Sequence, residues 1–243
     1  MSAIKTLEIL EQFDFETRTL SVPELASMLQ QPQSSVYRHL RLLKEKGYLI
    51  ENSPGLYSLG YIFLKLAKIV KMDMDLPSLS QKAMKELTRI TGETSILLVH
   101  SQFQAVCLAA VPSGHPIKVS SEQGNIVPIY GGASSKALLA YLGEETVKEI
   151  YKKDIVKKHT EHTILDVNEM LDHLKEVRQN GYAYSDSEID DGVVSYGIPI
   201  FESPGKIVAS LSIAGPKERM LKKDKSEIIQ AIETAKKMIE SQL

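Results

Sequence analysis

The residues best suited to chemistry lie between positions 33 and 46, where hydroxyl groups precede a series of cations. The segment reads QSSVYRHLRLLKEK. Val36, Leu40 and Leu43 recur at helical spacing and should face a core. The opposite face then carries Ser34, Tyr37, Arg38, Arg41 and Lys44. Hydroxyls and arginines on one helix face suit phosphate oxygens and guanine edges, so the pattern predicts a nucleic-acid-binding helix. The alternative is an ordinary solvated helix face.

Charge is concentrated on this segment. The chain of 243 residues has a net charge of -2, which argues against a globally basic DNA-binding protein. Residues 38–46 nevertheless carry four cations against Glu45 alone, a net charge of +3. Residues 1–37 carry two cations and five acids, a net charge of -3. Positive charge is therefore localised on the helix that we expect to meet the major groove.

The surrounding residues predict the elements that would position this helix. A first helix is expected at Ala3–Gln12. Ser21 and Glu24 form a capping box that begins a second helix, whose buried side should hold Leu25, Met28 and Leu29. Ser34 or Ser35 should cap the third helix, and Gly47 should end it. Alternating apolar residues at 48–50 and 56–60, around Pro54-Gly55, predict a hairpin. Three short helices and a hairpin make a winged helix-turn-helix.

Composition limits the remaining possibilities. Hydrophobic residues make up 43% of the chain and charged residues 25%, values typical of a globular protein. The single cysteine, Cys107, excludes an intrachain disulfide and a thiolate metal cluster, and its apolar neighbours predict a buried small side chain. Acids interrupt the first apolar segment, and no apolar run reaches the length of a membrane span. We therefore expect a cytoplasmic protein.

The chain resembles the isocitrate-lyase-regulator (IclR) family of bacterial transcriptional regulators. The resemblance rests on segments in family order: SVPELASML, PQSSVYRHLRLLKEKGYLI, LYSLG, GNIVPIYGGASSKALLAYL, GYAYSDSEIDDGVVSYGIPIF and GKIVASLSIAGP. It implies an α+β protein with a winged helix-turn-helix at 1–60, a linker helix at 61–78 and a GAF- or profilin-like effector-binding domain at 79–243. It also implies a DNA-binding regulator of catabolic genes, most simply a repressor, that acts without a cofactor.

The same resemblance implies the partners, and the polar face of the third helix indicates the DNA contacts. Members bind operator DNA as dimers or dimers of dimers and respond to a small metabolite, often a carboxylate or a sugar acid. The expected DNA contacts are Gln33, Ser34, Ser35, Tyr37, Arg38, Arg41 and Lys44, with the hairpin at Asn52–Tyr57 near the DNA backbone. The apolar circumference of Tyr61–Val70 predicts contact with a second copy of the chain.

The family's effector contacts fall on eight positions of this chain. They are Val119, Ala133, Ser134, Ser185, Asp186, Ser195, Ser212 and Ala214. Ile129-Tyr130-Gly131-Gly132-Ala133-Ser134 reads as a strand that runs through a small-residue loop into a helix, which lets a ligand approach the backbone. The chain departs from the family at Tyr130, Ser135, Ser185 and Ala214, so the effector of a relative does not transfer.

The second part of the chain alternates strands and helices, which predicts a mostly antiparallel sheet covered by helices. Expected strands are Ile96–Val99, Ala105–Val111, Ile117–Ser121, Gly192–Phe201 and Ile207–Ile213. Expected helices are Ser80–Thr91, Ser134–Leu142, Glu144–Tyr151, Val167–Asn180 and Lys222–Ile239.

Several alternatives stay open at this stage. The chain lacks the nucleophile elbow, the phosphate-binding loop and the dinucleotide fingerprint, which argues against an enzyme with an accessory winged domain. A winged helix that docks proteins is a third reading. The acids Asp186, Glu188, Asp190 and Asp191 read as an exposed loop rather than a metal site. His159 and His162 offer only a weak zinc pattern, and we predict neither a metal nor catalytic residues.

Overall fold

The computed structural model describes residues 3–72, 75–153 and 155–243. The chain divides into two compact units, residues 1–75 and residues 76–243, called here the N-terminal and C-terminal units. The predicted boundary between 78 and 79 therefore falls a few residues inside the C-terminal unit. None of the described helices combines the length and the apolar character that a bilayer crossing requires.

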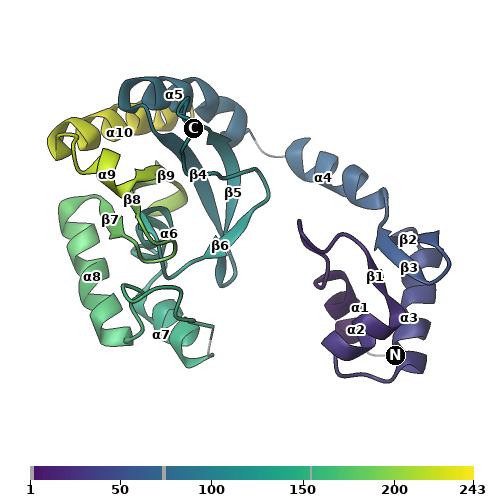
Figure 1. Ribbon diagram of the computed structural model, residues 1–243. Helices are drawn as coiled ribbons and strands as arrows, with labels where there is room; N and C mark the ends of the chain where they lie inside the picture. The colour runs from purple at the N-terminus through teal and green to yellow at the C-terminus, as the bar shows by residue number, and fades with distance from the viewer. Residues whose placement is uncertain (1–2, 73–74, 154) are drawn as a thin grey trace. The chain divides into compact units, whose positions relative to one another are not determined.

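The N-terminal unit is a winged helix-turn-helix (Figure 1). Its elements are α1 (Ala3–Leu10), β1 (Leu20–Ser21), α2 (Val22–Met28), α3 (Gln33–Glu45), β2 (Leu49–Ser53), β3 (Leu56–Leu59) and α4 (Ile62–Met72). The strands form an antiparallel sheet in the order β1-β3-β2. The predicted hairpin is thus confirmed, and β1 adds a third strand that the sequence pattern did not indicate.

Apolar residues from α1, α2 and α3 form the core of this unit. Val36 and Leu40 of α3 are fully buried against Leu25 of α2 and Ile9 of α1. The capping box is confirmed, because Ser21 accepts from the Glu24 N–H and the Glu24 carboxylate accepts from the Ser21 N–H. The cap of α2 and the shared apolar core together fix α2 and α3 relative to one another.

Two local predictions for this unit are wrong. Met28 is exposed because its side chain lies on the solvent face of the last turn of α2, whereas Leu25 and Leu29 pack on the core. Neither Ser34 nor Ser35 caps α3: the N-cap is Pro32, and no side chain caps this helix. The serine hydroxyls at the start of α3 are therefore not used in a helix cap.

The C-terminal unit is built on one antiparallel sheet of six strands in the order β6-β5-β4-β9-β8-β7. The strands are β4 (Thr94–Ser101), β5 (Gln104–Val111), β6 (Ile126–Pro128), β7 (Ala183–Asp186), β8 (Val193–Ser203) and β9 (Lys206–Pro216). The expected antiparallel sheet is confirmed. Four of the five expected strands are present with extended bounds, whereas Ile117–Ser121 forms no strand and the edge strand is β6 instead.

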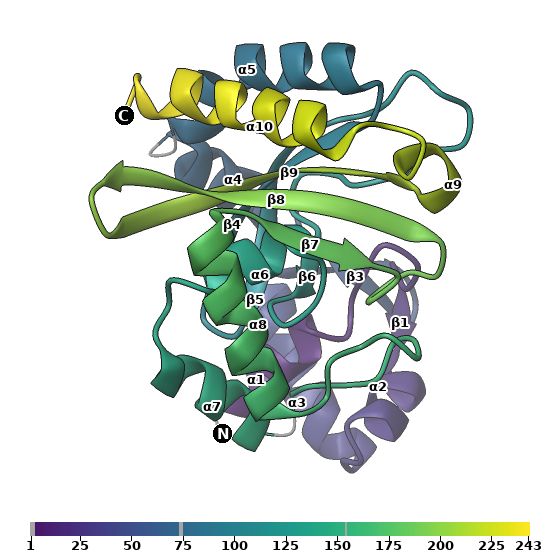
Figure 2. The ribbon, with the colours of Figure 1, turned by 90° about the vertical axis from the view of Figure 1, so that its left-hand side faces the viewer.

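Helices cover both faces of this sheet. They are α5 (Leu76–Thr91), α6 (Ala133–Leu139), α7 (Glu144–Lys152), α8 (Val167–Asn180), α9 (Lys217–Met220) and α10 (Lys225–Glu240). Figure 2 shows α5 and α10 side by side on one face, with α6 and α8 on the other. Each expected helix is present, although α5 begins at Leu76, before the expected start at Ser80. The short α9 and β7 carry too few residues for a periodic pattern and were not predicted.

Close backbone approach fixes α6 against the sheet. A Cβ atom on Gly197 of β8 would lie 2.7 Å from the backbone oxygen of Ala133, inside the contact limit. Glycine at this position therefore lets the start of α6 rest directly on β8. This arrangement forms one end of the cavity described below.

Candidate functional site

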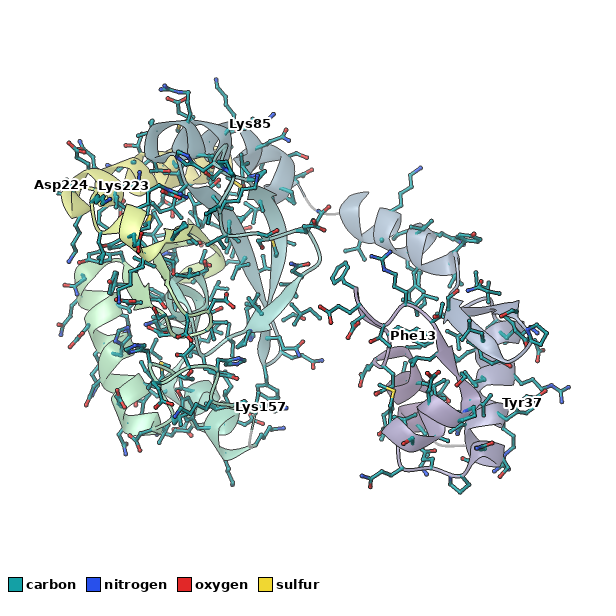
Figure 3. All side chains as sticks on the ribbon, viewed as in Figure 1. Phe13, Tyr37, Lys85, Lys157, Lys223 and Asp224 are labelled. Carbon is teal, nitrogen blue, oxygen red and sulfur yellow. The ribbon has the colours of Figure 1, made fainter. Side chains whose placement is uncertain are left out.

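The outer face of α3 is solvent-exposed and polar. Gln33, Ser34, Tyr37, Arg38, Arg41 and Lys44 are all exposed, and Ser35 is half-buried. The labelled Tyr37 side chain points out from α3 (Figure 3). Arg38 and Arg41 form no ion pair with any residue that the structure describes. Two guanidinium groups thus remain available on the face that the sequence analysis assigned to DNA.

Lys44 differs from the two arginines. Its ammonium pairs with Glu51 of β2, and this contact raises the pKa of Lys44 through the hydrogen bond to the carboxylate. Glu51 also accepts from the N–H of Gly55 at 2.8 Å, at the tip of the hairpin. Lys44 therefore links α3 to the β2–β3 hairpin, called the wing below, and its charge is partly compensated.

His39 supports α3 from the inner side. Its ring is buried, and Nδ1 lies 2.9 Å from Oγ1 of Thr6 on α1. Burial lowers the pKa of His39, and the positive charges of Arg38 and Lys5 lower it further. His39 was not among the predicted core residues of α3, since histidine occurs both in cores and on surfaces.

The C-terminal unit contains a cavity of about 140 Å³ over the sheet. Its base is a row of residues in register on neighbouring strands: Ala214 of β9 pairs with Ser195 of β8, which pairs with Ser185 of β7. Its other walls come from the start of α6, the segment after Gly131, and residues 119–121. A sheet register and a helix start thus bring together residues that are distant in sequence.

Six of the eight predicted effector contacts line this cavity. They are Val119, Ala133, Ser134, Ser185, Ser195 and Ala214. The remaining two do not line it. Ser212 lies behind the wall, where Ser134 Oγ is hydrogen-bonded to Ser212 Oγ. Asp186 faces another direction, with Oδ2 2.7 Å from Nζ of Lys217, and Lys217 and Ser187 keep the pKa of Asp186 low against the opposing effect of burial.

Two N–H groups of the small-residue loop already have hydrogen-bond acceptors within the chain. The N–H of Gly132 donates to Glu188 Oε2 at 3.2 Å, and the N–H of Ala133 donates to Ser195 Oγ at 3.2 Å. N–H groups at the start of a helix commonly serve an anionic ligand. In the structure, side chains of this chain already accept from two of them, so ligand recognition must draw on other groups.

A buried ion pair behind the cavity was missed by the sequence analysis. Lys136 of α6 is fully buried, and its ammonium pairs with the buried Glu188 and donates to the Tyr184 carbonyl at 2.7 Å. Its third contact is His173 Nε2 at 2.8 Å, so His173 accepts and is neutral. Burial lowers the pKa values of Lys136 and of His173.

This pair corrects one prediction and sets the charge of the cavity. Glu188 was assigned to an exposed acidic loop, yet only Asp190 and Asp191 of that loop are exposed. Glu188 lines the cavity with its charge compensated by Lys136. No lysine or arginine of the described residues lines the cavity, whose other polar groups are serine hydroxyls and Asp190.

The other candidate groups form no reactive constellation. Cys107 is buried, as predicted, and burial raises the pKa of its thiol. His159 is within 3.0 Å of the Tyr130 hydroxyl. Across residues 3–72, 75–153 and 155–243, three or more His, Cys, Asp or Glu side chains are nowhere arranged to hold a metal ion. Lys136 turns away from Ser134 toward Glu188, so these two residues form no nucleophile–base pair.

Family models match both the N-terminal and the C-terminal part of the chain. A family model described as "Bacterial transcriptional regulator IclR C-terminal" matches residues 69–241. A second, described as "IclR helix-turn-helix domain", matches residues 2–52. The chain is also 31% identical over 243 residues to the HTH-type transcriptional regulator KdgR of Dickeya chrysanthemi, which covers 100% of this chain and 79% of that protein.

Solved structures share the fold. A crystal structure from Silicibacter sp. TM1040, assigned to the IclR regulators, has a TM-score of 0.84 and 26% identity and covers 98% of this chain and 94% of that one. An IclR homologue from Microbacterium hydrocarbonoxydans, complexed with 4-hydroxybenzoate, has a TM-score of 0.80 and covers 98% of this chain and 96% of that one. At 19% identity the latter shows the fold alone.

Proposed function

The chain belongs to the IclR family of bacterial transcriptional regulators, and we propose that it represses catabolic genes in the cytoplasm until a small metabolite binds. It is a ligand-responsive DNA-binding regulator and not an enzyme with an accessory DNA-binding domain. Its proposed organisation is a DNA-binding domain at 1–60, a linker at 61–78 and an effector-binding domain at 79–243.

The exposed, uncompensated arginines of α3 carry the proposal for DNA. The helix enters the major groove, where Arg38 and Arg41 read guanine or hold phosphates, with Gln33, Ser34, Ser35 and Tyr37 beside them. Lys44 holds the wing and contributes to the phosphate contacts. The wing at Asn52–Tyr57 lies along the DNA backbone.

Arg38→Ala tests this interface. We expect operator binding to weaken by about 1–3 kcal/mol, because one guanidinium loses its base or phosphate contact. The operator is first selected from a random duplex library with the parent protein, and binding is then measured by fluorescence anisotropy. Arg18→Ala is the matched control, since Arg18 is exposed in the same unit but lies outside α3. Equal operator affinity of parent and Arg38→Ala would contradict the assignment.

The cavity supports a small, hydroxylated effector. Its volume of about 140 Å³ is close to that of a protein cavity that holds one benzene molecule. Six serine residues line it, and a serine hydroxyl can both donate and accept. Because its lining holds no cation, a carboxylate would be held by hydroxyl donors. We therefore propose a hydroxy acid or sugar acid the size of a six-membered ring.

A thermal-shift panel tests the effector class. Matched compounds of similar size are compared: a hydroxylated aliphatic acid, 4-hydroxybenzoate, and the corresponding neutral polyol and unsubstituted ring. We expect the hydroxylated acids to stabilise the protein most, because ligand binding to the folded state raises its stability. Ser195→Val, which removes a lining hydroxyl, should reduce that stabilisation. A panel in which only large apolar compounds bind would refute this class.

Operator binding also calls for a second copy of the chain. The outer surface of α4 is apolar, with exposed fractions of 70% at Leu64, 48% at Ile69 and 55% at Val70. We propose that this surface contacts a second copy, giving a dimer or a dimer of dimers with two recognition helices. Leu64→Glu together with Ile69→Glu should shift the species seen by analytical ultracentrifugation toward the monomer; an unchanged distribution would exclude α4 from the interface.

A further inference from the structure

A surface depression bordered by two segments lies beside the cavity of the C-terminal unit. It shares Val119, Ser120, Asp190 and Val193 with the cavity lining, so the two are direct neighbours. One rim is formed by residues 117–120, and the other by residues 190–193.

The first rim lacks regular backbone bonding. In the described structure, residues 112–121 belong to no helix or strand and make no backbone–backbone hydrogen bond. Their position depends instead on side chains: Thr94 Oγ1 donates to the Val119 carbonyl at 2.8 Å, and Arg219 Nη2 donates to the Ile117 carbonyl at 3.1 Å. Loss of either side-chain donor should free this rim.

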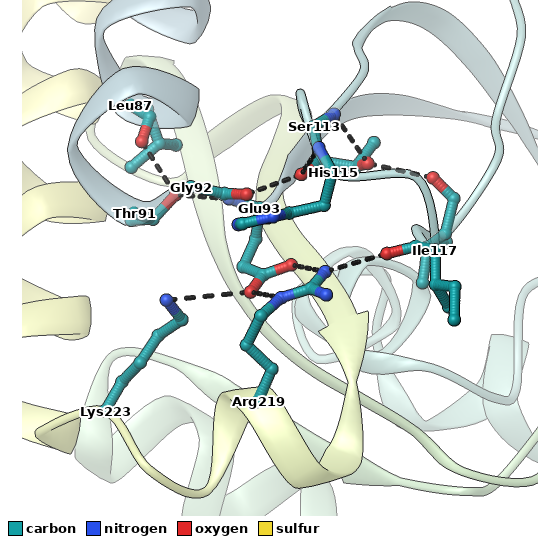
Figure 4. Close-up of polar contacts among 11 residues, drawn as sticks. Leu87, Thr91, Gly92, Glu93, Ser113, His115, Ile117, Arg219 and Lys223 are labelled. Atoms are coloured by element: carbon teal, nitrogen blue, oxygen red, sulfur yellow. Dashed lines mark hydrogen bonds and ion pairs between the residues drawn. The ribbon is translucent and has the colours of Figure 1, made fainter.

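Arg219 is itself held in place. Its guanidinium makes a forked contact with Glu93, with Nε 2.6 Å from Oε1 and Nη2 2.7 Å from Oε2 (Figure 4). Glu93 is fully buried, and Lys223 lies 3.6 Å from the same carboxylate. A Cβ atom on Gly215 would lie 2.3 Å from Glu93 Oε2, so glycine is required for this carboxylate to reach Arg219. Arg219 is thus a fixed donor to the first rim.

The second rim is held by the same short helix. The backbone N–H of Lys217 donates to the Gly192 carbonyl at 2.7 Å, and its ammonium lies 2.7 Å from Asp186 Oδ2. Lys217 and Arg219 are two residues apart on α9, which therefore contacts both rims. This contact also explains why Asp186 points away from the cavity.

We propose that the cavity opens between these two rims and that α9 sets the width of this mouth. Arg219 and Lys217 are then positioning residues that determine the size of effector admitted. Arg219, anchored by Glu93, holds the rim at Ile117. The backbone of Lys217 holds the rim at Gly192, and its ammonium fixes α9 to Asp186 of the neighbouring strand. Neither residue lines the cavity, so they act through the rims and touch no effector. The assignment rests on the proposed role of the cavity as the effector site.

The mouth can be tested without an identified effector or operator. In the full chain, Cys107→Ala removes the native thiol, and Ser195→Cys places a thiol in the cavity lining. Labelling rates are measured with methyl methanethiosulfonate and with the larger benzyl methanethiosulfonate. The ratio of the two rates cancels the intrinsic reactivity of the thiol, which both reagents share. It therefore reports access and not a general change of the site.

Arg219→Gln and Lys217→Met are then introduced separately. Arg219→Gln should raise the benzyl-to-methyl ratio, by up to about tenfold, because the rim at Ile117 loses a hydrogen bond from a charged donor. Lys217→Met keeps the backbone bond to Gly192 and removes only the ion pair with Asp186, so it should raise the ratio less. Asp186→Asn should act like Lys217→Met, and Glu93→Gln like Arg219→Gln. Combining Glu93→Gln with Arg219→Gln should add little, since both break the same contact.

Matched controls remove equivalent pairs elsewhere in the C-terminal unit. Arg89→Gln breaks a forked pair with Glu86 on α5, and Lys175→Met breaks a pair with Asp172 on α8. Neither should change the ratio. The proposal is overturned if the α9 variants keep the parent ratio or if the controls change it equally. Absence of operator binding would contradict only the proposed function, because labelling of the cavity requires no DNA.

Discussion

Cationic side chains have different roles in the two units: the arginines of α3 are unpaired among the described residues, and cations around the cavity are paired with carboxylates. On α3 of the N-terminal unit, Arg38 and Arg41 are exposed and have no carboxylate partner among the described residues. In the C-terminal unit, Lys136 and Arg219 are paired with buried carboxylates and hold parts of the cavity in place. Uncompensated charge suits a partner with many phosphates, whereas compensated charge suits a site that must keep its shape.

This difference explains why net charge is a poor guide to function here. The total of -2 conceals cations that are free for DNA and cations that are internally neutralised. Positive charge confined to one helix should give weak binding to bulk DNA. Specific affinity would then depend on two recognition helices together.

The largest effect is expected where the compensated pair is broken. Lys136→Met leaves the carboxylate of Glu188 buried without its cation, which typically costs about 3–5 kcal/mol of folding free energy. Urea unfolding followed by circular dichroism measures the loss. Pairing Lys136→Met with Glu188→Gln should restore part of the stability, because the unpaired charge is then gone. Equal stability of Lys136→Met and the parent would mean that the pair is not compensating.

The next effect sharpens the contrast within α3. Arg41→Ala should weaken operator binding by about 1–3 kcal/mol, because its guanidinium is free for DNA. Lys44→Ala should cost less, since this ammonium must first leave Glu51. Glu51→Gln should strengthen binding by releasing Lys44 and removing an acid beside the phosphates. Anisotropy titrations at two salt concentrations measure all three; equal losses at Arg41 and Lys44 would contradict the distinction.

How far the sequence predicts the structure depends on how local each feature is. The capping box at Ser21, the buried stripe of α3 and the Pro54-Gly55 turn depend on neighbouring residues and were predicted. The strand expected at Ile117–Ser121 was wrong, because backbone carbonyls of this segment accept from the side chains of Thr94 and Arg219 and not from a neighbouring strand.

Ion pairs between residues far apart in the sequence could not be predicted from local sequence patterns. Lys136 and Glu188 are separated by 52 positions, and a lysine in an apolar helix or a glutamate among acids reads as exposed. Asp186 was assigned to the cavity by resemblance, although its side chain turns to Lys217. Such contacts depend on the sheet register, which brings β7 beside β8 and places residues 183–188 next to α6.

Removal of a helix cap should cost similar stability in the two units, in contrast to the charged residues, whose roles differ between the units. Ser21→Ala removes the cap of α2. Asp166→Ala removes the cap of α8, where the Asp166 carboxylate accepts from two backbone N–H groups at 2.8 and 2.9 Å. Each should cost about 1 kcal/mol of stability. Proteolysis across a urea series, with fragment masses that identify the unit, should assign each loss to its own unit. A loss confined to one unit for both variants would contradict the expectation.

The smallest expected effect is the pH response of the N-terminal unit. Burial keeps the pKa of His39 below its ordinary value of 6.5, so below that pH the unfolded chain binds a proton that the folded unit resists. Stability is therefore fully present above pH 6.5 and falls as the pH decreases through the folded pKa. His39→Gln should flatten this dependence for the N-terminal unit in the same proteolysis assay. An unchanged slope would mean that His39 does not titrate with unfolding.

The coupling of cavity to operator tests the central claim most directly. Anisotropy titration of the selected operator, with and without a saturating concentration of the best compound from the thermal-shift panel, gives the ratio of the two Kd values. The account predicts a change of at least about fivefold, and an equal change in the compound's affinity when operator is bound, because coupling is reciprocal. Identical operator Kd values, with the compound shown to occupy the cavity, would contradict it.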